Sequence, residues 1–346
     1  MDKLLTWERW GLFNKNKHYS FKLFIADEIP GVKKTFLYNE DNKSDFKPAI
    51  NLISKLNICR SPYDADFVLV PHSWLSIKNN TVYKKYLISL SKSTPLLLEN
   101  SGDISPKCNL PNALQLRTFL HPNEKSHRKI ILPYPAKHQN FKIRDWKPIP
   151  QISFVGFVPK MSLGSLTSKS QSFVHSPFRS SVYLNRKLTV RKLKRLKNEF
   201  KIVCTERATF TLLPDNQNLN LDIQEYQENL SQSDYILCPR GFGNISIRFY
   251  ETLSAGATPI LIESGTKLPE LNDDKFWQSN ILLIKILSNW ANVVWKDWEY
   301  LGKGDNYLNR QLRNEQVFSS ELYIQKYLEK IFVDYLLPEI NDNSYL

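Results

Sequence analysis

The chain has 346 residues, of which 42% are hydrophobic and 12% aromatic, and its formal net charge is +13. This length exceeds what one hydrophobic core usually holds and predicts about two domains, while the hydrophobic content excludes a largely disordered chain. The positive charge favours an anionic partner, which could be nucleic acid, a phosphorylated substrate or an anionic lipid surface.

The amino-terminal region and the cysteines bear on where the protein works. Glu8 and Arg9 interrupt the first apolar residues, which is not the pattern of a signal peptide. The longest apolar runs are too short to span a bilayer. The four cysteines are scattered and form no Cys-x-x-Cys pair, which favours reduced thiols over disulfides. We therefore expect a soluble, cytoplasmic protein.

The first half of the chain alternates strand-like and helix-like segments. Short apolar runs at 21–27, 66–71 and 94–100 predict buried strands, and the spacing of apolar residues at 82–90 predicts a helix. A further apolar run at 129–135 ends in two prolines. The polar, proline-rich segment that follows, residues 137–150, is the expected linker between two domains.

The second half repeats the alternation. The predicted elements are a strand at 151–157, a basic helix at 185–200, a strand at 200–204, a helix at 222–232 and a strand at 235–238. Strands that alternate with helices favour parallel sheets with right-handed crossovers. We expect an α/β fold of two doubly wound, Rossmann-like domains, residues 1–145 and 146–318. A helix in 319–346 has an apolar side that suits packing back on the first domain.

Residues 235–262 combine glycines, arginines and a carboxylate in one strand–loop–helix–strand unit. Ligands of parallel sheets bind beyond the carboxyl ends of the strands, where helix amino termini present free N–H groups. Glycines let the backbone approach an anion closely, and Asn or Ser can cap the helix. The residues expected to face a ligand here are Arg240, Gly241, Gly243, Asn244, Ser246, Arg248 and Glu251.

This combination suits a nucleoside diphosphate. Arg240 and Arg248 are strong phosphate donors beside the positive end of a helix. Glu251 follows Arg248 by three residues, so that both can lie on one helix face, with the carboxylate one turn deeper and placed for ribose hydroxyls. The simpler alternative is an ordinary βαβ unit, in which Arg248 and Glu251 pair on the helix surface and the glycines only turn the chain.

The run YILCPRGFGNISIRFYETLSAGATPILIES, residues 235–264, closely resembles the signature of the exostosin family, glycosyltransferase family 47, especially its bacterial-type members. Weaker similarities lie at 65–71, 101–105, 129–135, 147–157 and 309–318. The resemblance implies a GT-B fold, with two Rossmann-like domains that face a cleft. It also implies transfer of a sugar from a nucleotide donor, with inversion at the anomeric carbon, to a glycan or lipid-linked acceptor.

The resemblance also implies roles for single residues. Arg240, Ser246 and Arg248 would face the diphosphate and Glu251 the ribose, while Arg207 is a looser match to another arginine of this half. Eukaryotic members carry a membrane anchor and a His-Asp pair near the position of Asp103, and this sequence lacks both. The acceptor class and the catalytic base therefore stay open.

Two residues of the first half are candidates for that base. His72 and Asp103 each follow a predicted strand, and either could deprotonate an acceptor hydroxyl. The alternatives are a polar histidine on a rim loop and an aspartate that caps a turn. Asp64 and Asp66 imitate a DxD metal motif, but they precede a strand instead of following it, which favours a solvated turn. No His or Cys spacing suggests zinc, so we expect neither a metal nor a cofactor besides the nucleotide sugar.

The run 186–197 carries seven basic residues with leucines along one side. The simplest interpretation is a solvated helix face, and the functional alternative is docking on an anionic membrane that holds a lipid-linked acceptor. Nucleic acid is not expected, because no reader motif accompanies the charge. The competing function for the whole chain is a basic binding protein that keeps the nucleotide-site fold without catalysis.

Overall fold

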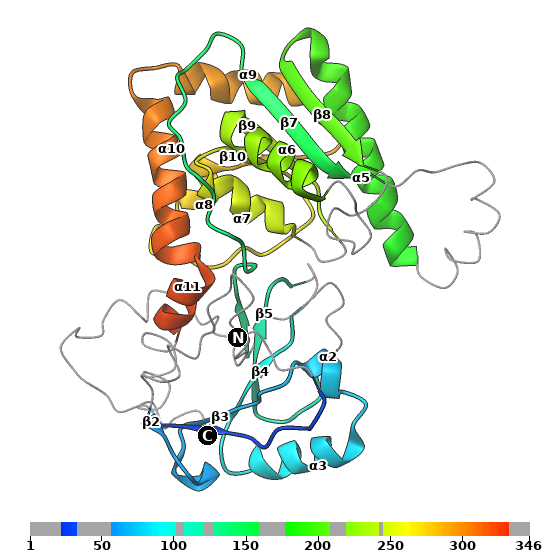
Figure 1. Cartoon of the computed structure of the whole chain (residues 1–346), viewed down its shortest axis with the longest axis vertical. Coiled ribbons are helices and arrows are strands. Elements are labelled where there is room, and N and C mark those ends of the chain that lie inside the picture. Colours follow the sequence, from blue (N-terminus) through cyan, green and yellow to red (C-terminus); the bar gives the residue numbers. More distant parts are fainter. Residues whose placement is uncertain are drawn as a thin grey trace, which may run out of the picture. The chain divides into compact units, whose positions relative to one another are not determined.

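A computed structural model describes residues 22–32, 57–101, 107–120, 128–158, 177–207, 219–241 and 245–331. The chain forms two compact units (Figure 1). Unit 1 combines Met1–Pro135, Lys267–Glu270 and Glu321–Leu346, and unit 2 combines Ala136–Thr266 and Leu271–Ser320. Among the helices in the described ranges, none combines the length and apolarity that crossing a bilayer requires.

Unit 1 contains a parallel sheet in the order β2-β1-β3-β4-β5-β6. Its strands are β1 (Lys22–Ile25), β2 (Asn57–Ile58), β3 (Phe67–Leu69), β4 (Leu96–Glu99), β5 (Ala113–Arg117) and β6 (Lys129–Ile131). Its helices are η2 (Pro62–Asp64), α2 (Trp74–Ile77), α3 (Thr81–Leu90) and α11 (Ile324–Lys330). The predicted strands at 21–27, 66–71 and 94–100 and the predicted helix at 82–90 are present in shortened or matching form.

Both faces of this sheet are buried, which explains why its strands are continuous apolar runs. Leu69 and Leu97 belong to a core cluster that also contains Leu328 of α11. Val68 and Leu98 point the other way, into a cluster with residues of α2 and α3. The carboxyl-terminal helix α11 is therefore part of the core of unit 1.

Unit 2 contains a parallel sheet in the order β11-β10-β9-β7-β8. Its strands are β7 (Gln151–Phe157), β8 (Lys201–Arg207), β9 (Tyr235–Cys238), β10 (Thr258–Ile262) and β11 (Leu282–Ile284). Its helices are α5 (Pro177–Arg195), η3 (Leu196–Asn198), α6 (Leu219–Gln232), α7 (Ile247–Ser254), α8 (Phe276–Asn280), α9 (Trp290–Leu301), α10 (Asn306–Val317) and the π-helix η4 (Phe318–Leu322). The predicted basic helix begins earlier than expected, at Pro177, and ends at Arg195.

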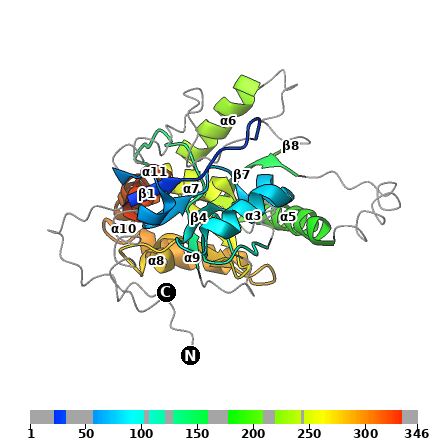
Figure 2. The same cartoon turned by 90° about the horizontal axis from the view of Figure 1, so that it is seen from below.

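The helices of unit 2 cover both faces of its sheet. Residues of α5 and α9 share one core cluster, with Val190 and Trp298 as members, and Figure 2 shows α6 and α7 on the other side of the sheet from α9. The strand order of each unit reverses once, which is the pattern of a doubly wound fold. The expected α/β fold, with two doubly wound Rossmann-like units, is confirmed.

The segment expected as a linker lies along unit 2. The ring of Trp146 stacks on that of Trp298, with 5.8 Å between the centroids, and the Trp298 indole donates to the Lys147 carbonyl at 2.9 Å. The Gln311 side chain accepts from the Arg144 backbone N–H and donates to the Arg144 carbonyl, both at 2.9 Å. The expected domain boundary at 145/146 thus falls inside a packed segment, because polar and proline-rich residues here pair with side chains of α9 and α10.

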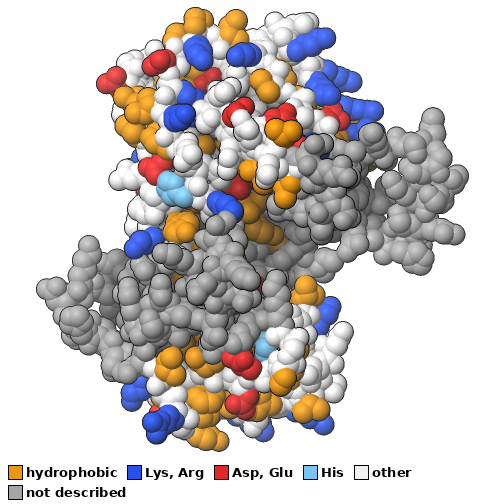
Figure 3. Space-filling view, viewed as in Figure 1, with side chains coloured by type: hydrophobic (Ala, Val, Ile, Leu, Met, Phe, Trp, Pro, Cys, Tyr) orange, Lys and Arg blue, Asp and Glu red, His pale blue; other side chains and the backbone are white. Residues whose placement is uncertain are grey.

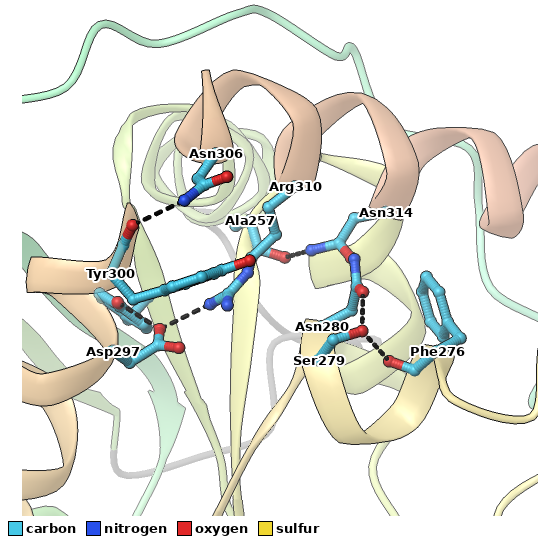
Figure 4. A network of polar contacts seen from close by, with 10 residues as sticks. Ala257, Phe276, Ser279, Asn280, Asp297, Tyr300, Asn306, Arg310 and Asn314 are labelled. Atoms are coloured by element: carbon cyan, nitrogen blue, oxygen red, sulfur yellow. Dashed lines mark hydrogen bonds and ion pairs between the residues drawn. The ribbon is translucent and has the colours of Figure 1, made fainter. Parts of the chain in front are cut away.

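Buried polar side chains fasten α10 to the sheet (Figure 4). The Asp297 carboxylate accepts from Arg310 at 2.6 Å and from the Tyr235 hydroxyl at 2.7 Å. One turn further along α10, the Asn314 amide donates to the Ala257 carbonyl at 2.8 Å. These contacts give Arg310 and Asn314 a structural role.

Candidate functional site

The second sheet opens between β7 and β9, at the point where its strand order reverses. The ladder between these strands ends at Ser153 and Ile236, whereas the ladder between β7 and β8 continues to Phe157 and Arg207. Beyond Ser153 the edge of β7 that faces β9 therefore pairs with no strand among the described residues. Ligands of doubly wound sheets bind at this position.

Arg248, in the first turn of α7, fills the opening. Its Nη2 donates to the Val155 carbonyl at 2.6 Å, and its guanidinium lies 4.7 Å from the Phe154 ring and 5.6 Å from the Tyr226 ring. The side chain is 7% exposed. Its Nε and Nη1 are buried and have no acceptor among the residues that the structure describes. A buried cation with unused donors is costly unless an anion completes it.

Gly156 makes room for this arginine. A Cβ atom at position 156 would lie 2.4 Å from Nη2 of Arg248, well inside van der Waals contact. Only glycine lets the guanidinium lie flat against the end of β7.

Glu251 lies one turn further along α7. It is partly buried, and its Oε2 accepts from the Tyr226 hydroxyl at 2.5 Å. Burial raises the pKa of Glu251, and the hydrogen bond from Tyr226 and the charge of Arg248 work in the opposite direction. Since Arg248 and Glu251 each bond to another element, a simple pair on the helix surface does not account for them.

The loop between β9 and α7 carries the other predicted residues. Arg240 is half-buried there, and burial lowers the pKa of its guanidinium, which nevertheless stays charged at neutral pH. Gly241 follows it, and a Cβ atom at this position would lie 3.9 Å from the Ile245 carbonyl oxygen, an ordinary van der Waals contact. Ser246 is the N-cap residue of α7, but its hydroxyl makes no capping hydrogen bond. Gly243 and Asn244 lie outside the described residues.

Arg207, the looser match to an arginine of the family, is the last residue of β8, and its side chain contacts α6. Its Nη2 donates to the Glu225 carboxylate at 2.7 Å and to the Asp222 carbonyl at 2.8 Å. Arg207 thereby fixes α6, the helix that carries Tyr226, and reaches the site through that helix.

The structure adds residues that sequence reasoning missed. Tyr226 contacts both Arg248 and Glu251, although it lies on another helix and no local pattern singles it out. Arg186, interpreted as part of a solvated basic face, lies 5.7 Å above the Phe154 ring, on which Arg248 also lies. In the sequence, only Gly156 at the end of a predicted buried strand indicated that another group approaches the backbone closely here.

The base candidates belong to unit 1. His72 follows β3 as expected, and it is fully buried. Its Nε2 accepts from the Ile29 backbone N–H at 2.8 Å, and its ring meets the Tyr83 ring edge-on at 5.9 Å. This nitrogen is therefore already engaged in joining the loops after β1 and β3. Asp103 lies outside the described residues, and both candidates stay predictions.

Within the described residues, no group of three or more His, Cys, Asp or Glu side chains could hold a metal ion. Asp64 lies in η2, and Asp66 accepts from the Lys22 backbone N–H at 2.6 Å. Both precede β3, as the interpretation of a turn requires.

The basic helix α5 divides its charges. Lys192 donates to the Ile286 and Ser288 carbonyls at 2.6 and 2.7 Å, and Lys194 pairs with Glu206 at 2.6 Å. Other basic side chains of this region, Arg191, Arg195 and Lys197, are exposed. Lys and Arg side chains gather over α5 and β8 (Figure 3).

The solved structures that match the chain include glycosyltransferases. One is a glycosyltransferase from Rickettsia africae ESF-5, at 14% identity over 88% of this chain and 84% of that chain, with a TM-score of 0.38. Another is the catalytic domain of starch synthase IV from Arabidopsis thaliana bound to ADP and acarbose, at 10% identity over 86% and 76%, with a TM-score of 0.40. A third, a GtfA/B complex, shares 10% identity over 80% of this chain and 57% of that chain, with a TM-score of 0.37. These low scores say nothing about ligands. No curated protein sequence matches the chain.

A family model does match the second half of the chain. It is the model of the RXYLT1 C-terminal domain, and the match covers residues 157–323. This range contains Arg207, the loop after β9, and all of α7 and α10. Residues 157–323 therefore resemble the RXYLT1 C-terminal domain, an exostosin-like domain, in agreement with the family resemblance of residues 235–264.

Proposed function

We propose that the protein is an inverting glycosyltransferase that moves a sugar from a nucleoside-diphosphate sugar to a hydroxyl of a glycan or lipid-linked acceptor. The observation that carries this proposal is that Arg248 is buried and has two donor nitrogens, Nε and Nη1, without an acceptor among the described residues. It lies at the switch point of the sheet, in the first turn of α7. A diphosphate supplies the missing acceptors.

In the proposed reaction the leaving group is the nucleoside diphosphate. Arg248, Arg240 and the free N–H groups of α7 oppose the negative charge that develops on it, and Glu251 accepts hydrogen bonds from the ribose. Because these groups already supply positive charge, we propose that no divalent cation takes part. Asp103 or His72 is the proposed base for the acceptor hydroxyl.

Nucleotide binding tests the proposal directly. UDP, GDP, ADP and CDP are added in turn, and thermal unfolding is recorded; the proposed function requires that at least one raises the Tm. Hydrolysis of the matching sugar donor is then measured with and without EDTA. No stabilisation by any nucleotide would reject the function. Activity that EDTA abolishes and manganese restores would reject metal independence alone.

We further propose that α5 contacts an anionic membrane, where a lipid-linked acceptor would be found. The exposed Leu184 and Leu188, 40% and 45% accessible, lie on the same helix as the exposed Arg191 and Arg195. The parent protein should sediment with phosphatidylglycerol vesicles and not with phosphatidylcholine vesicles. Equal binding by an Arg191→Glu, Arg195→Glu variant would contradict this contact.

Glu251→Gln separates ribose binding from chemistry. The change keeps the shape but replaces a charged acceptor by a neutral one, so the donor KM should rise about three- to tenfold while kcat changes little. Donor hydrolysis measures both parameters. Asp297→Asn, another partly buried carboxylate bonded to a tyrosine, serves as control and should leave KM unchanged. A collapse of kcat with an unchanged KM would instead make Glu251 the base.

A further inference from the structure

The donor site proposed above contains an aromatic residue that no sequence motif marks. Tyr226 comes from α6 and meets two residues of α7 at once. Its hydroxyl donates to Glu251 Oε2 at 2.5 Å, and its ring lies 5.6 Å from the Arg248 guanidinium. One side chain thus touches the residue proposed for the ribose and the residue proposed for the diphosphate.

We propose that Tyr226 is a positioning residue for the donor, which holds the Glu251 carboxylate in the orientation that receives the ribose hydroxyls. This inference rests on the proposed function of the site. Tyr226 acts through Glu251 and does not take part in the chemical step.

The direction of the hydrogen bond follows from burial. Burial and the nearby Glu251 carboxylate raise the pKa of Tyr226 well above its usual value, so the phenol keeps its proton at neutral pH and donates. One carboxylate oxygen of Glu251 is thereby occupied. The other, Oε1, has no donor among the described residues, and the side chain is only partly buried. A carboxylate with one oxygen fixed and one free is arranged to accept from a substrate hydroxyl.

Pre-organisation is the physical gain. A glutamate side chain rotates about three bonds, and each rotation that must stop on binding weakens the complex. The hydrogen bond from Tyr226 stops this rotation before the ligand arrives. The position of Tyr226 is itself fixed, because Arg207 donates hydrogen bonds to Asp222 and Glu225 on α6, the helix that carries Tyr226.

The hydroxyl and the ring of Tyr226 have separable effects. Tyr226→Phe removes the donor to Glu251 but keeps the aromatic face against Arg248. The variant should therefore lose affinity for a ligand with a ribose and keep its affinity for one without. Loss of the hydrogen bond should weaken nucleoside-diphosphate binding about three- to tenfold and leave inorganic pyrophosphate binding unchanged.

A second consequence concerns pH. The groups that face Glu251 are Tyr226 on α6, Arg248 on α7, Lys137 on the segment before β7, and Cys238 on β9. Ionised Glu251 accepts from ribose best, so affinity should be present above the pKa of Glu251 and lost as the pH falls through it. Without the hydrogen bond from Tyr226 this pKa rises, and the loss should begin at higher pH. The titration of the diphosphate itself is the same for parent and variant.

Isothermal titration calorimetry on the full chain tests the inference. The ligands are the nucleoside diphosphate that stabilises the parent most, its 2′-deoxy and 3′-deoxy analogues, and inorganic pyrophosphate. Tyr226→Phe is compared with Tyr235→Phe. Tyr235 lies at the start of β9, and its buried hydroxyl donates to the Asp297 carboxylate in the same way. The expected result is weaker nucleotide binding only in Tyr226→Phe. In this variant the affinities for ribose and deoxyribose ligands should differ less than in the parent. Its loss of affinity on acidification should begin at a higher pH.

Three results decide the inference. An unchanged nucleotide affinity in Tyr226→Phe would overturn it, and so would an equal loss for pyrophosphate, since that would mark a general structural role. Additive losses in a Tyr226→Phe, Glu251→Gln double variant would overturn it as well, because a positioning residue has no effect once its partner is gone. A parent that binds no nucleotide would instead reject the proposed function.

Discussion

Replacing Arg248 by methionine is expected to weaken nucleoside-diphosphate binding about ten- to a hundredfold, the loss of one or more hydrogen bonds from a charged donor. Methionine fills a similar volume, so the change removes the cation without leaving a large cavity. Of the three guanidinium nitrogens, Nε and Nη1 have no acceptor in the described ranges, and Nη2 donates to the Val155 carbonyl. We therefore expect the arginine to contribute more to binding than to folding.

Arg310→Met is the matched control for this variant. Arg310 is 8% exposed and Arg248 is 7% exposed, but Arg310 pairs with Asp297 at 2.6 Å, away from the site. Breaking one side of a buried ion pair should lower the free energy of unfolding by about 3 kcal/mol and leave nucleotide affinity unchanged. Calorimetry and urea denaturation on both variants give the comparison. If Arg248→Met stays folded and binds nucleotide as tightly as the parent, the donor site has been assigned to the wrong place.

The strands were predictable because both faces of each sheet are buried. A strand covered by helices on both sides is a short run of apolar residues, and such runs are visible at 66–71, 94–100, 151–157 and 235–238. Sequence analysis missed β2, β5 and β11, and β5 (Ala113–Arg117) shows one reason. Its Gln115 and Arg117 are buried, at 8% and 1% exposure, and polar residues in such a run hide the apolar pattern.

Local signals failed wherever a partner from elsewhere in the chain decides the structure. Residues 137–150 have the composition of a linker. Trp146 nevertheless stacks on Trp298 of α9, and Arg144 forms hydrogen bonds with Gln311 of α10, both far along the sequence. The helical periodicity of 186–197 does not say that Arg186 lies over Phe154 while Arg191 is exposed. Composition predicts which segments are polar, and tertiary contacts select which polar side chains are buried.

The same distinction holds for the site. Arg248 and Glu251 could be singled out as candidates because the strand, glycine loop and helix that carry them are continuous in sequence. Tyr226 could not, since it lies 25 residues before Glu251 on a separate helix. The position of the site follows from strand order, which places the reversal between β7 and β9 and which no single segment encodes.

Gly156→Ala should be nearly as damaging to nucleotide binding as the loss of the arginine itself. The new Cβ would lie 2.4 Å from Nη2 of Arg248, so the guanidinium must leave the Val155 carbonyl and move by about an ångström. A displacement of this size in a positioned group can cost about a hundredfold, and we expect a ten- to hundredfold weaker affinity for the nucleoside diphosphate. Gly156 has φ +156°, a backbone conformation that residues with a side chain rarely adopt, so the alanine should also lower the free energy of unfolding. The affinity is therefore compared at a temperature at which the variant is folded.

Gly302→Ala provides the steric control for Gly156→Ala. A Cβ at position 302 would lie 2.9 Å from the Trp146 ring, which stacks on Trp298 at the far side of unit 2 from the loop after β9. This variant should lose stability and keep nucleotide affinity. In the double variant Gly156→Ala, Arg248→Met the affinity should equal that of Arg248→Met alone, because the alanine lowers the affinity by moving the arginine. If the affinity losses of the two single variants add, Gly156 contacts the ligand by itself. The proposal that the opening between β7 and β9 serves to hold Arg248 would then be wrong.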